Sequence, residues 1–279
     1  MDKAIIDYIV NCMIHGEDTS IQEIQTEHRL KLAHYWGIKK GSRILEIGCG
    51  QGDMTAVLAY AAGKDGFIHA VDIASPAYGA PFTLGEASTY LKDSPLGKTI
   101  QFSYNLDLLS PDVQFEKNEF DYIIFSHCSW YFSSPEELQK LFHRTRSWGA
   151  SLCFAEWDSR IMDIEQMPHL MAALIQAQYE CWKEESQSNI RTLFTPNDIR
   201  NLIGQAGWEI ERDSQIYSPM LQDAKWEVDF VLSEYENELK QITGLPLKAE
   251  RLLRSQIDLL MQSSKTSIKP MSAYVCKAY

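Results

Sequence analysis

The stretch RILEIGCGQGDMT (residues 43–55) decides the fold class, because it joins a short apolar run to a helix-like run through closely spaced glycines. Gly48, Gly50 and Gly52 alternate with single residues, and Glu46 precedes the first glycine by two positions. Glycine lets the backbone approach a ligand that a Cβ atom would block, and the first N–H groups of a following helix are free. The stretch therefore predicts a strand, a ligand-binding turn and a helix.

The glycine spacing distinguishes between classes of ligand. A dinucleotide-binding GxGxxG pattern would need its third glycine at position 53, where Asp53 instead places an anion beside the position of a pyrophosphate. A Walker phosphate loop is disfavoured because no GK[ST] follows. A nicotinamide-dependent oxidoreductase is the weaker alternative, because only the glycine turn and Asp72 favour it.

Outward from this turn, short apolar runs alternate with amphipathic segments. Strands are expected at residues 43–48, 67–73, 99–105, 120–127, 150–157, 209–217 and 272–279, and helices at residues 54–63, 85–93, 135–149 and 195–208. This alternation predicts an α/β fold with a mostly parallel sheet, helices on both faces and a ligand at the carboxyl ends of the strands.

Further helices are expected outside the alternation. Two lie at the N-terminus: residues 5–13, ending near Gly16, and a helix that starts with a capping box of Ser20 and Glu23. The others are expected at residues 161–188, 223–242 and 247–262. We predict N-terminal cap helices (1–35), a core (36–160, continued at 193–218 and 269–279) and two helical cap insertions (161–192 and 219–268).

The ExGxGxG pattern at the end of a predicted strand resembles the first motif of the class I S-adenosylmethionine-dependent methyltransferases. The resemblance covers residues 36–157, with final strands within 195–217 and 271–279. It implies a Rossmann-like, doubly wound, seven-stranded sheet with an antiparallel last strand. With its helical cap, the chain is similar to small-molecule methyltransferases and to cyclopropane-fatty-acyl-phospholipid-synthase-like proteins. Lipid cyclopropanation is disfavoured, because the bicarbonate-binding residues of a true cyclopropane synthase are not identified in the sequence.

S-adenosylmethionine carries no phosphate, so it tolerates an acidic turn. Asp72 follows the second strand, where its carboxylate can accept hydrogen bonds from two ribose hydroxyls. The resemblance makes Asp107 an acceptor for the adenine amine. The alternatives are a buried structural role for Glu46 and turn-capping roles for the two aspartates. The predicted cofactor contacts are Glu46, Gly48, Cys49, Gly50, Gly52, Asp72, Ile73, Asn105, Leu106, Asp107, Ser126, His127 and, from the N-terminal helix, His28.

The methyl acceptor is expected beside the ends of the fourth and fifth strands. His127 is the candidate general base, Glu156 a carboxylate that orients or deprotonates the acceptor, and Tyr131 part of an aromatic pocket wall. Each has a structural alternative: a packing contact for His127, an anchor of the cap for Glu156, and core packing for Tyr131. No metal site is predicted.

The composition bounds the partners. A net charge of −12 disfavours nucleic acid and anionic membrane surfaces. Six dispersed cysteines without a CxxC pair fit a reducing compartment, and no apolar run is long enough for stable membrane insertion. We therefore expect a cytoplasmic protein with a small-molecule acceptor, as a monomer or a homodimer. A non-catalytic module that binds S-adenosylmethionine or S-adenosylhomocysteine is the second functional hypothesis.

Overall fold

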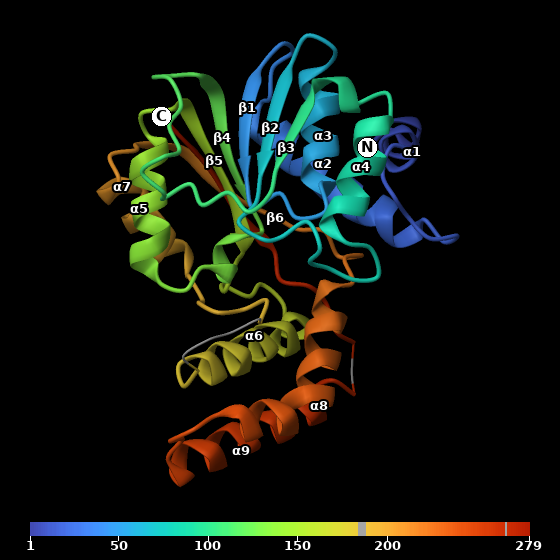
Figure 1. Ribbon diagram of the computed structural model, residues 1–279. Coiled ribbons are helices and arrows are strands. Elements are labelled where there is room, and N and C mark those ends of the chain that lie inside the picture. The colour runs from blue at the N-terminus through green and yellow to red at the C-terminus, as the bar shows by residue number, and fades with distance from the viewer. Residues whose placement is uncertain (184–187, 266) are drawn as a thin grey trace.

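The computed structural model describes residues 1–183, 188–265 and 267–279. Its centre is a seven-stranded sheet in the order β3-β2-β1-β4-β5-β7-β6 (Figure 1). The strands are β1 Arg43–Ile47, β2 Phe67–Val71, β3 Ile100–Ser103, β4 Phe120–Ser126, β5 Gly149–Trp157, β6 Ile210–Ile216 and β7 Ala273–Ala278. Strands β1 to β5 pair in parallel, whereas β7 lies antiparallel between β5 and β6. The predicted fold class is confirmed.

Helices cover both faces of the sheet (Figure 1). One face packs against α1 Lys3–Val10, α2 Ser20–Trp36, α3 Asp53–Ala62 and α4 Leu84–Asp93, and the other against α5 Pro135–Thr145 and α7 Pro196–Gln205. The chain passes from β1 to β2 and β3 on one side of β1 and returns to β4 on its other side. The glycine turn after β1 therefore lies where the strand order reverses, which is the usual ligand position in such sheets.

Three helices form a separate group at the carboxyl ends of the parallel strands. They are α6 Met167–Glu180, α8 Asp223–Gln241 and α9 Leu247–Ser263, and we call them the helical layer. Figure 1 shows them packed together beyond one end of the sheet. Their shared apolar cluster includes Ile175, Val228 and Ile257, so the layer has a small core of its own.

The structure corrects several expected helix boundaries. The helix expected at 161–188 is shorter: a 3₁₀ turn, η3 Ile164–Gln166, precedes α6, which starts at Met167 with Pro168 in its first turn and ends at Glu180. Residues 184–187 of that prediction, and residue 266 of the second predicted insertion, lie outside the described residues. The helix expected at 135–149 ends at Thr145, because Gly149 already begins β5. The predicted segment boundaries themselves stay predictions.

The N-terminal helices also differ from the predicted pattern. Helix α1 ends at Val10 rather than near Gly16, and Asn11 caps it. The capping box of Ser20 and Glu23 is wrong, because the helix N-cap is Thr19 and its side chain caps no backbone N–H. The Thr19 hydroxyl instead donates to the Glu23 carboxylate, which also accepts from Lys3 of α1.

Candidate active site

The glycine turn uses each glycine differently. All three have positive φ angles, +71° at Gly48, +53° at Gly50 and +92° at Gly52. A Cβ atom on Gly48 would lie 2.6 Å from Cβ of Cys128, so this glycine permits close packing between β1 and the end of β4. A Cβ atom on Gly50 would meet nothing within 4 Å. Gly50 is therefore the position where the turn leaves space for a ligand to approach the backbone.

Asp72 is fixed beside this turn. Its Oδ2 accepts a hydrogen bond from the Gly50 N–H at 2.9 Å, and its Oδ1 accepts one from the Ala74 N–H at 2.9 Å. The carboxylate is half-buried, and each oxygen keeps a lone pair for a further donor. Ile73 follows with 66 % of its surface exposed, which is unusual for a large apolar side chain beside a core strand.

The loop after β3 lies directly against Asp72. The Asn105 N–H donates to the Ala74 carbonyl at 3.0 Å, and the Leu106 N–H donates to the Asp72 carbonyl at 3.1 Å. Asp107 is exposed and accepts from the Leu109 N–H at 2.7 Å, which is the turn role considered as its alternative. The structure thus brings together the predicted ribose and adenine contacts around one edge of the glycine turn.

Glu46 is placed differently. Only 2 % of its surface is exposed, and its Oε2 accepts a 2.6 Å hydrogen bond from the Thr55 hydroxyl of α3. Burial raises its pKa to about 8, and the Thr55 hydrogen bond only partly opposes this shift. In this structure Glu46 ties β1 to the start of α3, and its direct contact with a cofactor stays a prediction.

Helix α2 crosses over the same region. Gln22 and Arg29 both contact Asp53 at the start of α3; Arg29 does so by an ion pair of 3.7 Å. The Asp53 carboxylate that argued against a phosphate therefore anchors the N-terminal helix. Arg29 also donates to the Gln25 side chain, whose amide donates to Asp223 of α8 at 2.7 Å. Helix α2 thus connects the glycine turn with the helical layer.

Two histidines meet where α2 passes the end of β4. His28 Nε2 lies 3.1 Å from His127 Nε2, and His28 Nδ1 lies 3.0 Å from the Ser218 hydroxyl. His127 Nδ1 lies 3.4 Å from Glu156 Oε1. Burial is the main cause that holds the pKa of His28 well below its ordinary value, and the neighbouring His127 lowers it further. We assign the proton of His127 to Nδ1, facing the carboxylate, so that its Nε2 accepts from His28.

The backbone at His127 is itself unusual. Its φ angle is +51°, a left-handed conformation that costs a non-glycine residue roughly 1 kcal/mol and is enriched at functional sites. The His127 N–H donates to the Ala155 carbonyl of β5 at 2.8 Å, which continues the sheet pairing one residue beyond β4. Ser126, the last residue of β4, is half-buried beside it.

Glu156 is a buried and well-bonded carboxylate. Its Oε2 accepts from the N–H and the hydroxyl of Ser129 at 3.0 and 2.8 Å, and its Oε1 accepts from the Trp157 N–H at 3.0 Å. These bonds fix the 3₁₀ turn η2 Ser129–Tyr131, which carries Trp130 and Tyr131. The geometry favours the positioning role of Glu156 over that of a free base.

A cavity of about 190 Å³ lies between these groups, and we call it the strand-end cavity. It is enclosed by α2, η2, the ends of β4 and β5, α6 and the start of α8. Its lining residues are Gln25, His28, Arg29, His127, Trp130, Tyr131, Glu156, Trp157, His169, Asn189, Ile190, Leu221, Asp223 and Glu227. The structure brings His127, Tyr131 and Glu156, the residues predicted around the acceptor, together with His28, which was predicted as a cofactor contact. Their roles stay predictions.

Sequence reasoning missed three groups in this cavity. His169 of α6 is fully buried there, and Asp223 and Glu227 of α8 also line the cavity. The sequence does contain a signal for the two carboxylates: they are four residues apart, which places them on one face of a helix. For His169 the sequence offers no comparable signal, because its position depends on contacts of α6 with Trp157, at the end of β5, and with Met271, before β7.

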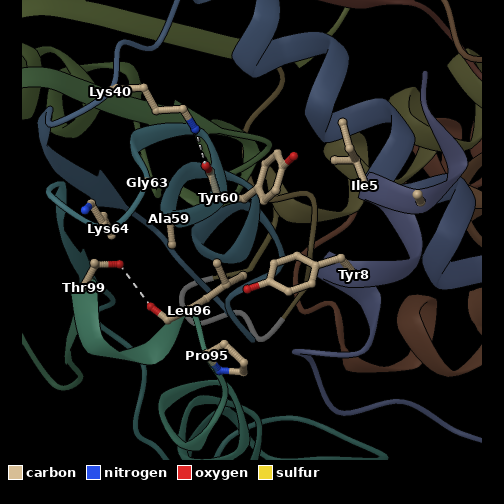
Figure 2. A pocket seen from close by; sticks show the side chains of 11 residues that line it. Ile5, Tyr8, Lys40, Ala59, Tyr60, Gly63, Lys64, Pro95, Leu96 and Thr99 are labelled. Atoms are coloured by element: carbon tan, nitrogen blue, oxygen red, sulfur yellow. Dashed lines mark hydrogen bonds between the residues drawn. The ribbon is translucent and has the colours of Figure 1, made fainter.

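A larger cavity, of about 450 Å³, lies at the other end of the strands. Figure 2 shows it between α1, the end of α3 and the segment around Leu96. The Lys40 ammonium donates to the Tyr60 carbonyl at 3.0 Å on its wall. Since Lys40 precedes β1 and Lys64 precedes β2, this cavity lies at the amino ends of the strands, away from the glycine turn.

The described residues offer neither a metal site nor a membrane-spanning helix. They contain no cluster of three or more His, Cys, Asp or Glu side chains arranged to hold a metal ion. None of their helices combines the length and apolar character needed to cross a membrane.

The chain is similar to known proteins in both sequence and fold. Residues 21–212 match the family model described as a methyltransferase domain. A cyclopropane-fatty-acyl-phospholipid synthase-like protein from Lactobacillus casei ATCC 334 has a solved structure with a TM-score of 0.86 and 33% sequence identity, over 99% of each chain.

More distant proteins match over part of their length. Methyltransferase phomM' of Diaporthe leptostromiformis is 28% identical in an alignment of 212 residues that covers 62% of this chain and 54% of that protein. The chain thus spans about half the length of the curated relatives it matches. Phosphoethanolamine N-methyltransferase 2 of Haemonchus contortus, solved with S-adenosyl-L-methionine, has a TM-score of 0.51 and 16% identity over 90% of this chain and 52% of that one. This last similarity shows a shared fold.

Proposed function

Because the chain belongs to the methyltransferase-domain family, we propose that it transfers a methyl group from S-adenosylmethionine to a small organic acceptor held in the strand-end cavity. The family expected from the glycine turn is confirmed, and S-adenosylmethionine is the cofactor that this assignment supports. The observation that carries the proposal is the position of the cavity. It lies at the carboxyl ends of β4 and β5, and Arg29 on its wall also pairs with Asp53, directly after the glycine turn. Helix α2 and the helical layer, which would act as a cap, line its other side.

The residues around the turn fit the cofactor. The Asp72 carboxylate, held by two backbone N–H groups, would accept the ribose hydroxyls, and the open side of Gly50 would admit the methionine portion. Ile73 and the loop of Asn105, Leu106 and Asp107 would surround the adenine. Arg29 would face the methionine carboxylate from α2. These assignments keep the sequence-based predictions, which also place Arg29 of the N-terminal helix over the methionine carboxylate; Arg29 lines the strand-end cavity.

The acceptor would lie against the ends of β4 and β5. When bound, the cofactor supplies a methyl group on a positively charged sulfur, so catalysis needs mainly an aligned nucleophile and the exclusion of water. Tyr131 and Trp157 would form the walls, and Glu156 would keep η2 and His127 in place. His127 Nε2 would take the proton of a hydroxyl or thiol acceptor by giving up the hydrogen bond that it accepts from His28.

Calorimetry with S-adenosylhomocysteine tests the cofactor assignment. We expect saturable binding that weakens by at least about tenfold in Asp72→Ala, because a charged acceptor of two ligand hydrogen bonds is removed. Asp112→Ala is the matched control, since Asp112 is an exposed aspartate in the same half of the chain. Equal affinity in wild type and Asp72→Ala would refute the assignment.

The alternatives give different outcomes. A non-catalytic module would bind S-adenosylhomocysteine but release none from S-adenosylmethionine with any acceptor, whereas turnover of a single acceptor would reject it. An oxidoreductase would bind NAD and not S-adenosylhomocysteine. All six cysteines are free thiols, which supports our proposal of a reducing, cytoplasmic location. The proposal requires no second chain, so monomer and homodimer both remain compatible with it.

A further inference from the structure

Helix α8 presents two carboxylates to the strand-end cavity. Asp223 and Glu227 are four residues apart, which places them on one face of the helix, and both line the cavity. Their hydrogen-bond donors are neutral amides: Gln25 donates to Asp223 at 2.7 Å and Gln176 donates to Glu227 at 2.6 Å. Within the described part of the chain, no lysine or arginine forms an ion pair with either carboxylate. This wall of the cavity therefore carries negative charge without a cationic partner.

The burial of Glu227 makes this charge costly. Burial is the main cause that raises its pKa; the nearby Asp223 carboxylate raises it further, and the hydrogen bond from Gln176 opposes the shift. Other cavity groups do not offset the charge: Arg29 is directed to Asp53, and His28 and His169 are held neutral by burial. A cation bound in the cavity would favour the charged form of both carboxylates.

Two buried donors, on residues that line the cavity, also have no hydrogen-bond partner among the described residues. The Met271 N–H donates to His169 Nδ1 at 3.0 Å, which fixes the ring proton on Nε2 because a backbone N–H cannot accept. His169 Nε2 then has no hydrogen-bond partner in the described parts of the chain, although the residue is 0% exposed. The indole Nε1 of Trp130, a residue only 3% exposed, is likewise unpartnered. Buried donors of this kind normally have an acceptor, so they point to an oxygen atom on a ligand.

We infer that the methyl acceptor is a small amine that also carries a hydrogen-bond-accepting oxygen, with its nitrogen toward Asp223 and Glu227 and its oxygen toward His169 and Trp130. This inference rests on the proposed function, because it names the acceptor of the same site. The rings of Trp130, Tyr131 and Trp157 suit a cationic group through their electron-rich faces. At about 30 Å³ for each water molecule, a cavity of about 190 Å³ holds roughly six waters, so the acceptor has roughly that number of non-hydrogen atoms or slightly more.

The chemical step balances with this acceptor. The ammonium nitrogen gives one proton to a cavity carboxylate, which exposes its lone pair. That lone pair forms the new bond to the methyl carbon, while the carbon–sulfur bond breaks and its electron pair stays on sulfur. The products are a methylated ammonium ion, which now carries the positive charge, and S-adenosylhomocysteine with a neutral thioether sulfur; no oxidant or reductant is needed.

Three matched probes test the inference. Leucinol carries an amine and a hydroxyl, 4-methylpentan-1-ol lacks the amine, and 3-methylbutan-1-amine lacks the hydroxymethyl group. Each is titrated at millimolar concentration into the full-length protein saturated with S-adenosylhomocysteine. We expect leucinol to bind most tightly and the alcohol to bind at least about tenfold more weakly. Equal or tighter binding of the alcohol, or no binding of either amine, would overturn the inference.

Variants assign the binding to the named residues. Glu227→Gln should weaken both amines by about tenfold or more and leave the alcohol unchanged, because only the charge is removed. Asp229→Asn is the matched control: it removes a carboxylate from the same helix, where Asp229 is exposed and paired with Lys225. If Glu227→Gln does not fold, Asp223→Asn replaces it, with S-adenosylhomocysteine binding as the measure of folding.

The two conclusions fail separately. Loss of S-adenosylhomocysteine binding in the wild-type protein would remove the proposed function itself. If the protein still binds S-adenosylhomocysteine but the affinity for the amines is the same in wild type, Glu227→Gln and Asp223→Asn, only the amine assignment is overturned. If leucinol and 3-methylbutan-1-amine bind equally, the oxygen contact with His169 and Trp130 is overturned.

Discussion

Replacing Glu46 by glutamine should stabilise the protein increasingly as the pH rises. In the folded protein, burial raises the pKa of Glu46 from 4.5 to about 8, so the folded state keeps a proton that the unfolded chain releases. The contribution of this group to stability is therefore favourable below pH 4.5 and is lost as the pH rises toward 8, at about 1.4 kcal/mol per pH unit. Over the whole interval the loss is about 5 kcal/mol.

Glutamine cannot ionise, so the variant escapes this loss while it keeps the shape of the side chain. Its carbonyl oxygen can accept the hydrogen bond that the Thr55 hydroxyl donates to Glu46. Between about pH 6 and pH 8, the free energy of unfolding of the variant should therefore rise by about 3 kcal/mol relative to the wild type.

Urea unfolding of both proteins across this pH range measures the difference directly. Glu17→Gln, at an exposed position, is the control for the general effect of removing one negative charge. A difference between wild type and Glu46→Gln that does not change with pH would refute the reasoning, because Glu46 would then ionise in the folded protein as it does in the unfolded chain.

Other substitutions test the turn and the cavity. Gly48→Ala should lower the free energy of unfolding in urea by about 2–4 kcal/mol, because of its left-handed backbone and an overlap that the fold must relieve. Gly50→Ala should lower it by only about 1 kcal/mol, but it should weaken S-adenosylhomocysteine binding more than about tenfold in calorimetry. The reverse order of effects would contradict the distinction between these glycines. Glu156→Gln should lower stability by about 2 kcal/mol, because its amide group would face a backbone donor, and an unchanged urea midpoint would argue against its anchoring role. Burial lowers the pKa of His169 from 6.5 to about 3, so the folded state lacks a proton that the unfolded chain gains, and its stabilising contribution falls as the pH drops below 6.5, by about 1.4 kcal/mol per pH unit. In urea unfolding below pH 6.5, the free energy of unfolding of His169→Gln should therefore fall less steeply with decreasing pH than that of the wild type. An equal fall in both proteins would contradict the assignment of a neutral, buried ring.

The sheet could be predicted because its signals are local. Apolar runs, glycine turns and helix caps lie within a few residues of the elements they define, and Thr195 with Pro196 marks the start of α7 as expected. The same holds for Asp72 and the loop at Asn105, which follow adjacent strands and therefore meet at one edge of the sheet.

The rest of the site depends on contacts between distant segments. His28 meets Ser218 across 190 positions of the chain, and Gln25 meets Asp223 across 198 positions. Periodicity shows that α2 and α8 are helices but not how they approach each other, because packing decides that approach. Glu46 shows a related limit, since its spacing from the glycines is visible in the sequence but its burial against Thr55 is not.

Helix α2 forms a common wall of the proposed cofactor site and the proposed acceptor site. It touches the start of α3 through Arg29 and α8 through Gln25, and its His28 lines the cavity between them. A ligand that holds this helix in place at one site therefore lowers the cost of ordering it for the other. Thermodynamic linkage then makes the benefit mutual: whatever factor the cofactor adds to the affinity for the acceptor, the acceptor returns to the cofactor. Residence times of both ligands are set in part by a segment that precedes the first strand.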